Sequence, residues 1–154
     1  MTHFRATAGT VLLTLALAGC GGSSTGSSNQ ELSYSEFAKQ ANAICKEERA
    51  KTEASVKKLT GQSAHDKAVW PSLLDQLRSG YDRFEKLNPP EELQPDFDRF
   101  NAAHQETLTL AEEAGAAADQ GDEESYAHAF KALQDRPNSA ATAGSKLGAA
   151  ECAK

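Results

Sequence analysis

Two titratable side chains fall on the apolar faces of expected helices, and they are the first candidates for chemistry. His104 lies four residues after Phe100 on one such face, and Glu48 interrupts the apolar face of an earlier helix. A histidine and a glutamate buried on facing helices can form an ion pair or hold a ligand. One interpretation is therefore a ligand site in the interior of a helical bundle, lined by Glu48, Trp70, Tyr81, Phe100 and His104, and the other is a His104 that is structural or half exposed.

Neither a metal site nor a catalytic centre is expected, and no cofactor is predicted. The sequence lacks the Glu-x-x-His spacing that diiron bundles repeat on two helices and the Cys-x-x-Cys-His motif of covalent haem. His65 lies near a helix start, and His128 lies off the face that carries Tyr126 and Phe130. Hydrolytic catalysis needs a nucleophile, a base and an oxyanion hole, and no Gly-x-Ser-x-Gly occurs. We therefore expect a protein that is not an enzyme.

A pattern at the start of the chain predicts how the protein is anchored. One positive charge, Arg5, precedes an apolar run over residues 6–18, and the run leads into Leu17-Ala18-Gly19-Cys20. This pattern resembles the signal peptide and lipobox of bacterial lipoproteins. The run is shorter than the roughly 20 apolar residues that a membrane-spanning helix needs. The resemblance implies cleavage between Gly19 and Cys20, a diacylglyceryl group on Cys20, and anchoring by lipid on the extracytoplasmic face of the cell membrane.

The same pattern divides the chain into three parts. Residues 1–19 are the expected signal peptide, and residues 20–30 combine the lipidated cysteine with a linker of Gly, Ser and Thr. Such a linker behaves as a flexible coil with a reach of about 17 Å over ten residues. Residues 31–154 carry the apolar periodicity and form the expected domain.

Cysteine counting predicts one disulfide. With Cys20 used for lipid, Cys45 and Cys152 remain as an even pair in an oxidising compartment. The alternative, two reactive or metal-binding thiols, needs a His or another Cys within helical reach, and neither cysteine has one. We therefore expect a bridge between Cys45 and Cys152.

Composition agrees with a folded domain and restricts its partners. The chain is 39% hydrophobic and 25% charged, values typical of a globular protein. Its formal net charge of −6, without clusters of Lys and Arg, argues against nucleic acid and against charge-driven binding to anionic lipid head groups.

Local signals predict an all-α fold, an up-down-up-down four-helix bundle. Ser33 and Glu36 have the spacing of a capping box, which starts a helix expected to reach Thr60. Apolar residues recur at three and four from Trp70 to Leu87 in the second helix, a third helix follows Pro95, and Asp122 can cap the fourth. The expected ranges are 33–60, 70–87, 95–120 and 122–152.

The predicted disulfide conflicts with a straight last helix. In an antiparallel bundle Cys152 would reach the level of the start of the first helix, twelve residues from Cys45. At 1.5 Å per residue the mismatch is about 18 Å, far more than a disulfide spans. We therefore expect the last helix to break near Pro137 and the first turns of the first helix to project beyond the bridge.

Three short segments resemble a group of small actinobacterial lipoproteins. The segments are residues 37–45, 87–93 and 147–153, the first and last of which contain Cys45 and Cys152. The resemblance implies a helical domain with one cysteine near each end and adds no catalytic residue.

Two functions remain open. The first is a non-enzymatic module that binds an envelope protein or an envelope ligand. The alternative is a carrier of a small ligand or metal in the bundle interior around His104.

Overall fold

A computed structural model describes residues 31–154, and every regular element in that range is helical. The longer helices are α1 (Tyr34–Val56), α3 (Trp70–Glu85), α4 (Gln94–Gln120), α5 (Glu123–Asp135) and α6 (Ser139–Lys146). Single turns of helix form α2 (Ser63–Asp66), η1 (Glu91–Leu93) and η2 (Ala150–Ala153). The all-α prediction is confirmed. Within residues 31–154, no helix has the length and apolar character needed to cross a membrane.

The first helix starts where the sequence predicts and ends earlier. Ser33 accepts a hydrogen bond from the Glu36 amide, and the Glu36 carboxylate accepts one from the Ser33 amide at 3.1 Å. This is the predicted capping box. The expected extension to Thr60 is wrong, because α1 ends at Val56 and the amides of Thr60 and Gly61 bond to the Asp66 carboxylate instead.

Asp66 holds the turn between α1 and α3 together. Its side chain is fully buried and accepts hydrogen bonds at 2.8 Å from the amides of Thr60 and Gly61. It also accepts one from the hydroxyl of Tyr126 on α5. Burial alone would raise the pKa of Asp66, but these hydrogen bonds outweigh burial and lower it. The turn is therefore built around a satisfied carboxylate.

Proline, glycine and aspartate mark the ends of the middle helices. Pro71 and Pro95 lie in the first turns of α3 and α4, where a missing amide proton costs little. Gly121 ends α4 in the left-handed conformation, with φ of +70°. Asp122 then accepts a hydrogen bond from the Ser125 amide at 3.1 Å and caps α5.

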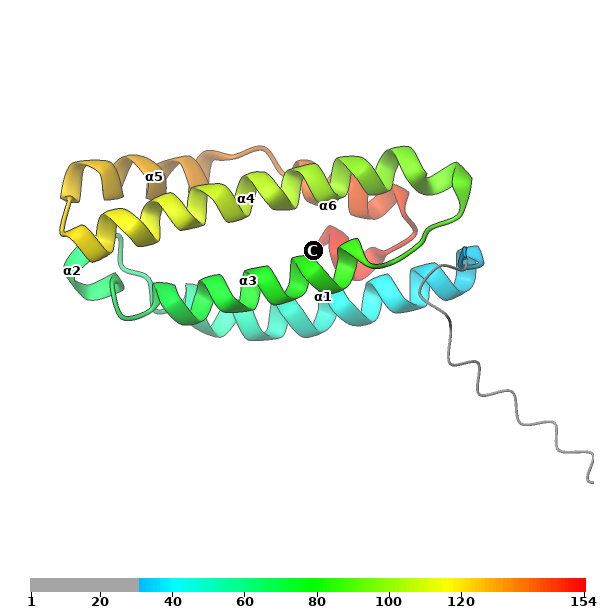
Figure 1. Cartoon of the computed structure of the whole chain (residues 1–154), viewed down its shortest axis with the longest axis horizontal. Coiled ribbons are helices and arrows are strands. Elements are labelled where there is room, and N and C mark those ends of the chain that lie inside the picture. The colour runs from blue at the N-terminus through cyan, green and yellow to red at the C-terminus, as the bar shows by residue number, and fades with distance from the viewer. Residues whose placement is uncertain (1–30) are drawn as a thin grey trace, which may run out of the picture.

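The last helical segment is interrupted twice. As predicted, the chain leaves helical geometry around Pro137, between the end of α5 and the start of α6. The expectation that the helix then continues to Cys152 is wrong, because α6 ends at Lys146 and Gly148 takes a φ of +68°. The chain turns back there, and a Cβ on Gly144 would lie 2.8 Å from the carbonyl oxygen of Cys152. η2 therefore packs directly on α6 (Figure 1).

This reversal brings the two cysteines together. Cys45 and Cys152 form the predicted disulfide, with their Cα atoms 5.1 Å apart. The length mismatch is removed by the break at Pro137 together with the reversal at Gly148, of which only the break was expected. η2 has no buried residue of its own, so the bridge and a few polar contacts hold it.

Buried side chains form two separate clusters. The first contains Phe37, Ala41, Phe84, Leu93, Phe97, Phe100, Ala143, Leu147 and Ala149. The second contains Trp70, Leu73, Ala111, Ala114, Ala117, Ala118, Tyr126 and Ala129. α3 and α4 contribute to both clusters, whereas α5 belongs to the second and α6 to the first. The break at Pro137 thus lies between the two clusters.

Candidate ligand-binding site

A cavity of about 270 Å³ lies between α1, α3 and α4 on one side and the α5–α6 connection with η2 on the other. Its walls come from both clusters, since Phe84 and Phe100 belong to the first and Leu77 packs against the second. On the side of the α5–α6 connection, the wall is formed by Arg136 and Asn138, which flank the break at Pro137, and by the first turn of α6. The cavity therefore exists because the last helix is broken.

The structure brings four of the five predicted ligand residues to this cavity. Glu48, Tyr81, Phe100 and His104 line it, from three different helices. Trp70 does not: it is 2% exposed in the second cluster, where its ring packs edge-on against Tyr126 at 6.3 Å. Helical periodicity identifies a buried face but not the cluster that buries it, so the sequence did not separate Trp70 from the other four residues.

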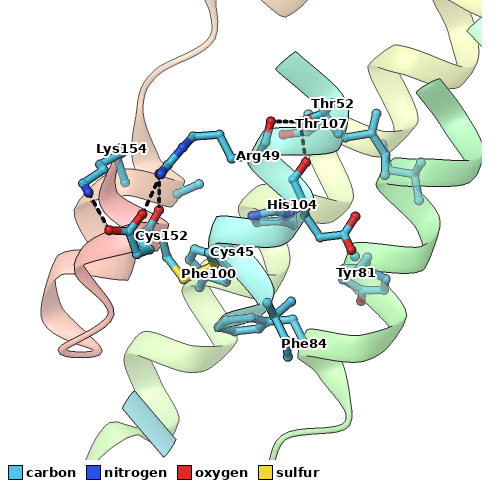
Figure 2. A pocket seen from close by; sticks show the side chains of 18 of the residues that line it. Cys45, Arg49, Thr52, Tyr81, Phe84, Phe100, His104, Thr107, Cys152 and Lys154 are labelled. Atoms are coloured by element: carbon cyan, nitrogen blue, oxygen red, sulfur yellow. Dashed lines mark hydrogen bonds and ion pairs between the residues drawn. A yellow bond between two sulfur atoms is a disulfide. The ribbon is translucent and has the colours of Figure 1, made fainter. Parts of the chain in front are cut away.

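His104 lies in the middle of the lining (Figure 2). Its ring stacks on Phe100, with the centroids 4.4 Å apart and the planes inclined by 38°. Burial, helped by the positive charge of Arg136, lowers the pKa of His104 to about 4. The imidazole is therefore neutral near neutral pH, and it offers a flat face, one donor and one acceptor.

Glu48 is held at the edge of the cavity by ion pairs. Its Oε1 lies 2.8 Å from Arg83 and 3.3 Å from Lys51, and only 13% of the side chain is exposed. Its Oε2 is buried and has no hydrogen-bond partner among residues 31–154. Gly80 makes room for this carboxylate, because a Cβ there would lie 2.7 Å from Cγ of Glu48.

Glu48 and His104 do not form the ion pair that the sequence allowed. They line the same cavity, but the cationic partners of Glu48 are Arg83 and Lys51, and His104 is neutral. Residues 31–154 contain no cluster of three His, Cys, Asp or Glu side chains suited to a metal ion.

Cations gather at the rim of the cavity, and no pattern in the sequence predicted that they would. Arg49 and Lys154 both pair with the carboxylate of Glu151 at 2.5 Å, which lowers the pKa of Glu151 to about 2, the Lys154 contact contributing most (Figure 2). Arg136 also lines the cavity and is half-buried. It makes no ion pair within the described part of the chain. The one signal in the sequence was its position next to the predicted break at Pro137.

The predicted lipobox, its Cys20 and the linker lie outside the described residues. Comparisons with known protein families, with curated proteins and with solved structures find no match. The cavity is therefore the feature from which a function is inferred.

Proposed function

We propose that this protein is a non-enzymatic ligand-binding lipoprotein that takes a small organic molecule into the cavity around His104. The observation that carries the proposal is the cavity itself, which opens between two packed clusters and is lined by aromatic rings and by polar groups, among them the Oε2 of Glu48, which has no hydrogen-bond partner among residues 31–154. Ligand sites commonly combine apolar walls with a few converging polar groups. The cavity favours a small ligand over an envelope protein as the partner.

The outer surface supports the same choice. The large apolar side chains exposed in residues 31–154 are Tyr34 and Val56, each about half exposed. They occupy the first and last positions of α1, so they do not form one continuous patch. A protein-docking surface would normally show a larger apolar area.

The groups in the cavity suit binding better than catalysis. The hydroxyls of Thr52 and Thr107 donate to backbone carbonyls one turn earlier, and Cys45 is held in the disulfide. The lowered pKa of His104 makes it a weak base. No nucleophile among the described lining residues is paired with a base, which supports a non-enzymatic role.

The anchor and the bundle complete the proposal. Cys20 would carry the lipid and tether the domain to the extracytoplasmic face of the cell membrane, as the lipobox resemblance implies. The domain would be an up-down-up-down four-helix bundle in which α5 and α6 together make the fourth helix. In support, both helices pack against α4 and follow one another along it (Figure 1).

Native mass spectrometry of the full-length protein, exported and extracted in detergent without reductant, tests the proposal. A small molecule should co-purify with the wild type and with Ala127→Leu, whose site is exposed on α5. It should be lost from Ala141→Leu, which places three extra carbon atoms in the cavity wall. A wild type that carries no adduct and that no small molecule stabilises against heat would contradict ligand binding.

Lipidation is tested separately. Cells fed an alkyne-tagged fatty acid should label the wild-type protein, and Cys20→Ala should remove the label. An unlabelled wild type would contradict the anchor and leave the cavity proposal standing.

A further inference from the structure

We infer that the cavity selects small amphiphilic anions, with a carboxylate bound by Arg136 and an apolar body lying against Phe84 and Phe100. The inference rests on the proposed function, because it names the chemical class of ligand for that same cavity. It follows from the charges at the rim, from the rings inside and from the volume.

Arg136 is the charged group of the lining that is left without a counter-charge. Glu48 is paired with Arg83 and Lys51, and Arg49 and Lys154 share Glu151. Within residues 31–154 the guanidinium of Arg136 has no carboxylate partner. The protein as a whole has a net charge of −6, but this half-buried and unpaired arginine gives the edge of the cavity a positive charge. A guanidinium binds a carboxylate with two parallel hydrogen bonds.

The charge of Arg136 reaches the interior. Its positive charge disfavours protonation of His104. This effect adds to that of burial, and together they lower the pKa of His104 and keep the imidazole neutral. A cationic ligand would meet the same repulsion in a space of low dielectric constant. An anionic ligand would instead find the guanidinium and the uncharged ring nitrogens, while the two carboxylates of the lining, Glu48 and Glu151, are each paired with cations.

One part of the lining is apolar and flat. The rings of Phe84 and Phe100 lie 4.3 Å apart, His104 stacks on Phe100, and the disulfide adjoins them (Figure 2). An apolar cavity of about 150 Å³ holds benzene. The 270 Å³ available here therefore suits a ring with a short side chain. A small aryl-alkyl carboxylate meets both the size and the charge.

Three probes of one shape and different charge test the inference: phenylpropanoate, phenylpropanol and phenylpropylamine. Their binding to the full-length protein is measured by titration calorimetry at neutral pH, in detergent and without reductant. Phenylpropanoate should bind most tightly and phenylpropylamine most weakly. Arg136→Gln should weaken phenylpropanoate by about 10- to 100-fold and change phenylpropanol little. Arg78→Gln, an exposed arginine outside the cavity, is the matched control and should change neither.

The outcomes separate the inference from the proposed function. Equal binding of the three probes, or no loss on Arg136→Gln, would overturn the preference for anions and leave a ligand-binding cavity. Tightest binding of the amine would do the same and assign recognition to the free oxygen of Glu48. If none of the three probes binds, the inference fails. If, in addition, wild type carries no adduct and no small molecule stabilises it, the proposed function fails with it.

Discussion

Cys45 and Cys152 are bonded to each other in the wall of the cavity that His104 lines. The bond joins α1 to η2, an element with no buried residue. Asn42 accepts a hydrogen bond from the Glu151 amide at 2.7 Å, and Arg49 pairs with the Glu151 side chain, but both contacts are partly exposed. The disulfide therefore positions one side of the ligand site as well as closing the chain.

Removing the disulfide should lower stability and weaken the site together. For a closed loop of roughly 100 residues the chain-entropy model gives at most about 4 to 5 kcal/mol. The double variant Cys45→Ala/Cys152→Ala should accordingly unfold at a lower urea concentration and lose affinity for the cavity ligand. Cys20→Ala, which leaves the bridge intact, serves as the control. An unchanged urea midpoint would show that the bridge does not constrain the fold.

His104 should make stability depend on pH between 6.5 and 4. Its pKa falls from the ordinary 6.5 to about 4 in the folded protein, so the unfolded chain binds more protons in that window. Stability present above pH 6.5 is lost as the pH falls to 4, by up to about 3 kcal/mol. His104→Phe, which keeps the stacking on Phe100, should flatten the profile. His128→Phe, at an exposed site on α5, should leave the profile as in wild type.

Gly80→Ala should destabilise the protein although the change favours helix formation. In an exposed helix the substitution gains up to about 1 kcal/mol. Here the new Cβ would lie 2.7 Å from Cγ of Glu48, so we expect a net loss of roughly 1 to 3 kcal/mol. Ser79→Ala, at the exposed neighbouring position, is the control. In a double-mutant cycle by urea unfolding, Glu48→Ala should suppress most of the loss, and simple additivity would exclude this clash as the cause.

Asp66→Asn should cost about 2 to 4 kcal/mol, because a buried carboxylate with four donors becomes an amide that accepts with one oxygen only. Since the folded pKa is lowered, the stabilisation from Asp66 is present above its ordinary value of 3.8 and is lost as the pH falls below it. The variant should show less acid destabilisation in urea titrations below pH 3.8. Asp75→Asn, on a side chain that is 83% exposed, should have little effect on the free energy of unfolding.

The helix boundaries that the sequence predicted correctly depend on neighbouring residues. The capping box of Ser33 and Glu36, the stop at Gly121 and the cap at Asp122 are each made within a few positions of the chain. The end of α1 was missed because Thr60 and Gly61 bond to the Asp66 carboxylate, which Tyr126 of α5 also contacts. The reversal at Gly148 was missed because that glycine packs against Tyr34, far away in the sequence. Gly148 follows a segment rich in alanine and other small residues, and this composition predicts that the helix continues.

The residues of the site that follow from local patterns were also predicted. Periodicity placed Phe100 and His104 on one helix face, and Glu48 was found because it interrupts the apolar face of an earlier helix. Arg136 was missed because its role comes from the space that opens where α5 ends, and this space depends on how two distant clusters are arranged. The disulfide was predictable because it follows from counting rather than from packing.

Because the buried side chains form two clusters that share α3 and α4, we expect the domain to open locally as two units. α5 can open with the second cluster and α6 with the first, so amide hydrogen exchange in these two helices reports on different opening events. A molecule in the intervening cavity touches walls from both units. Its binding therefore couples the two opening events, and exchange in α5 and α6 slows together when the site is occupied.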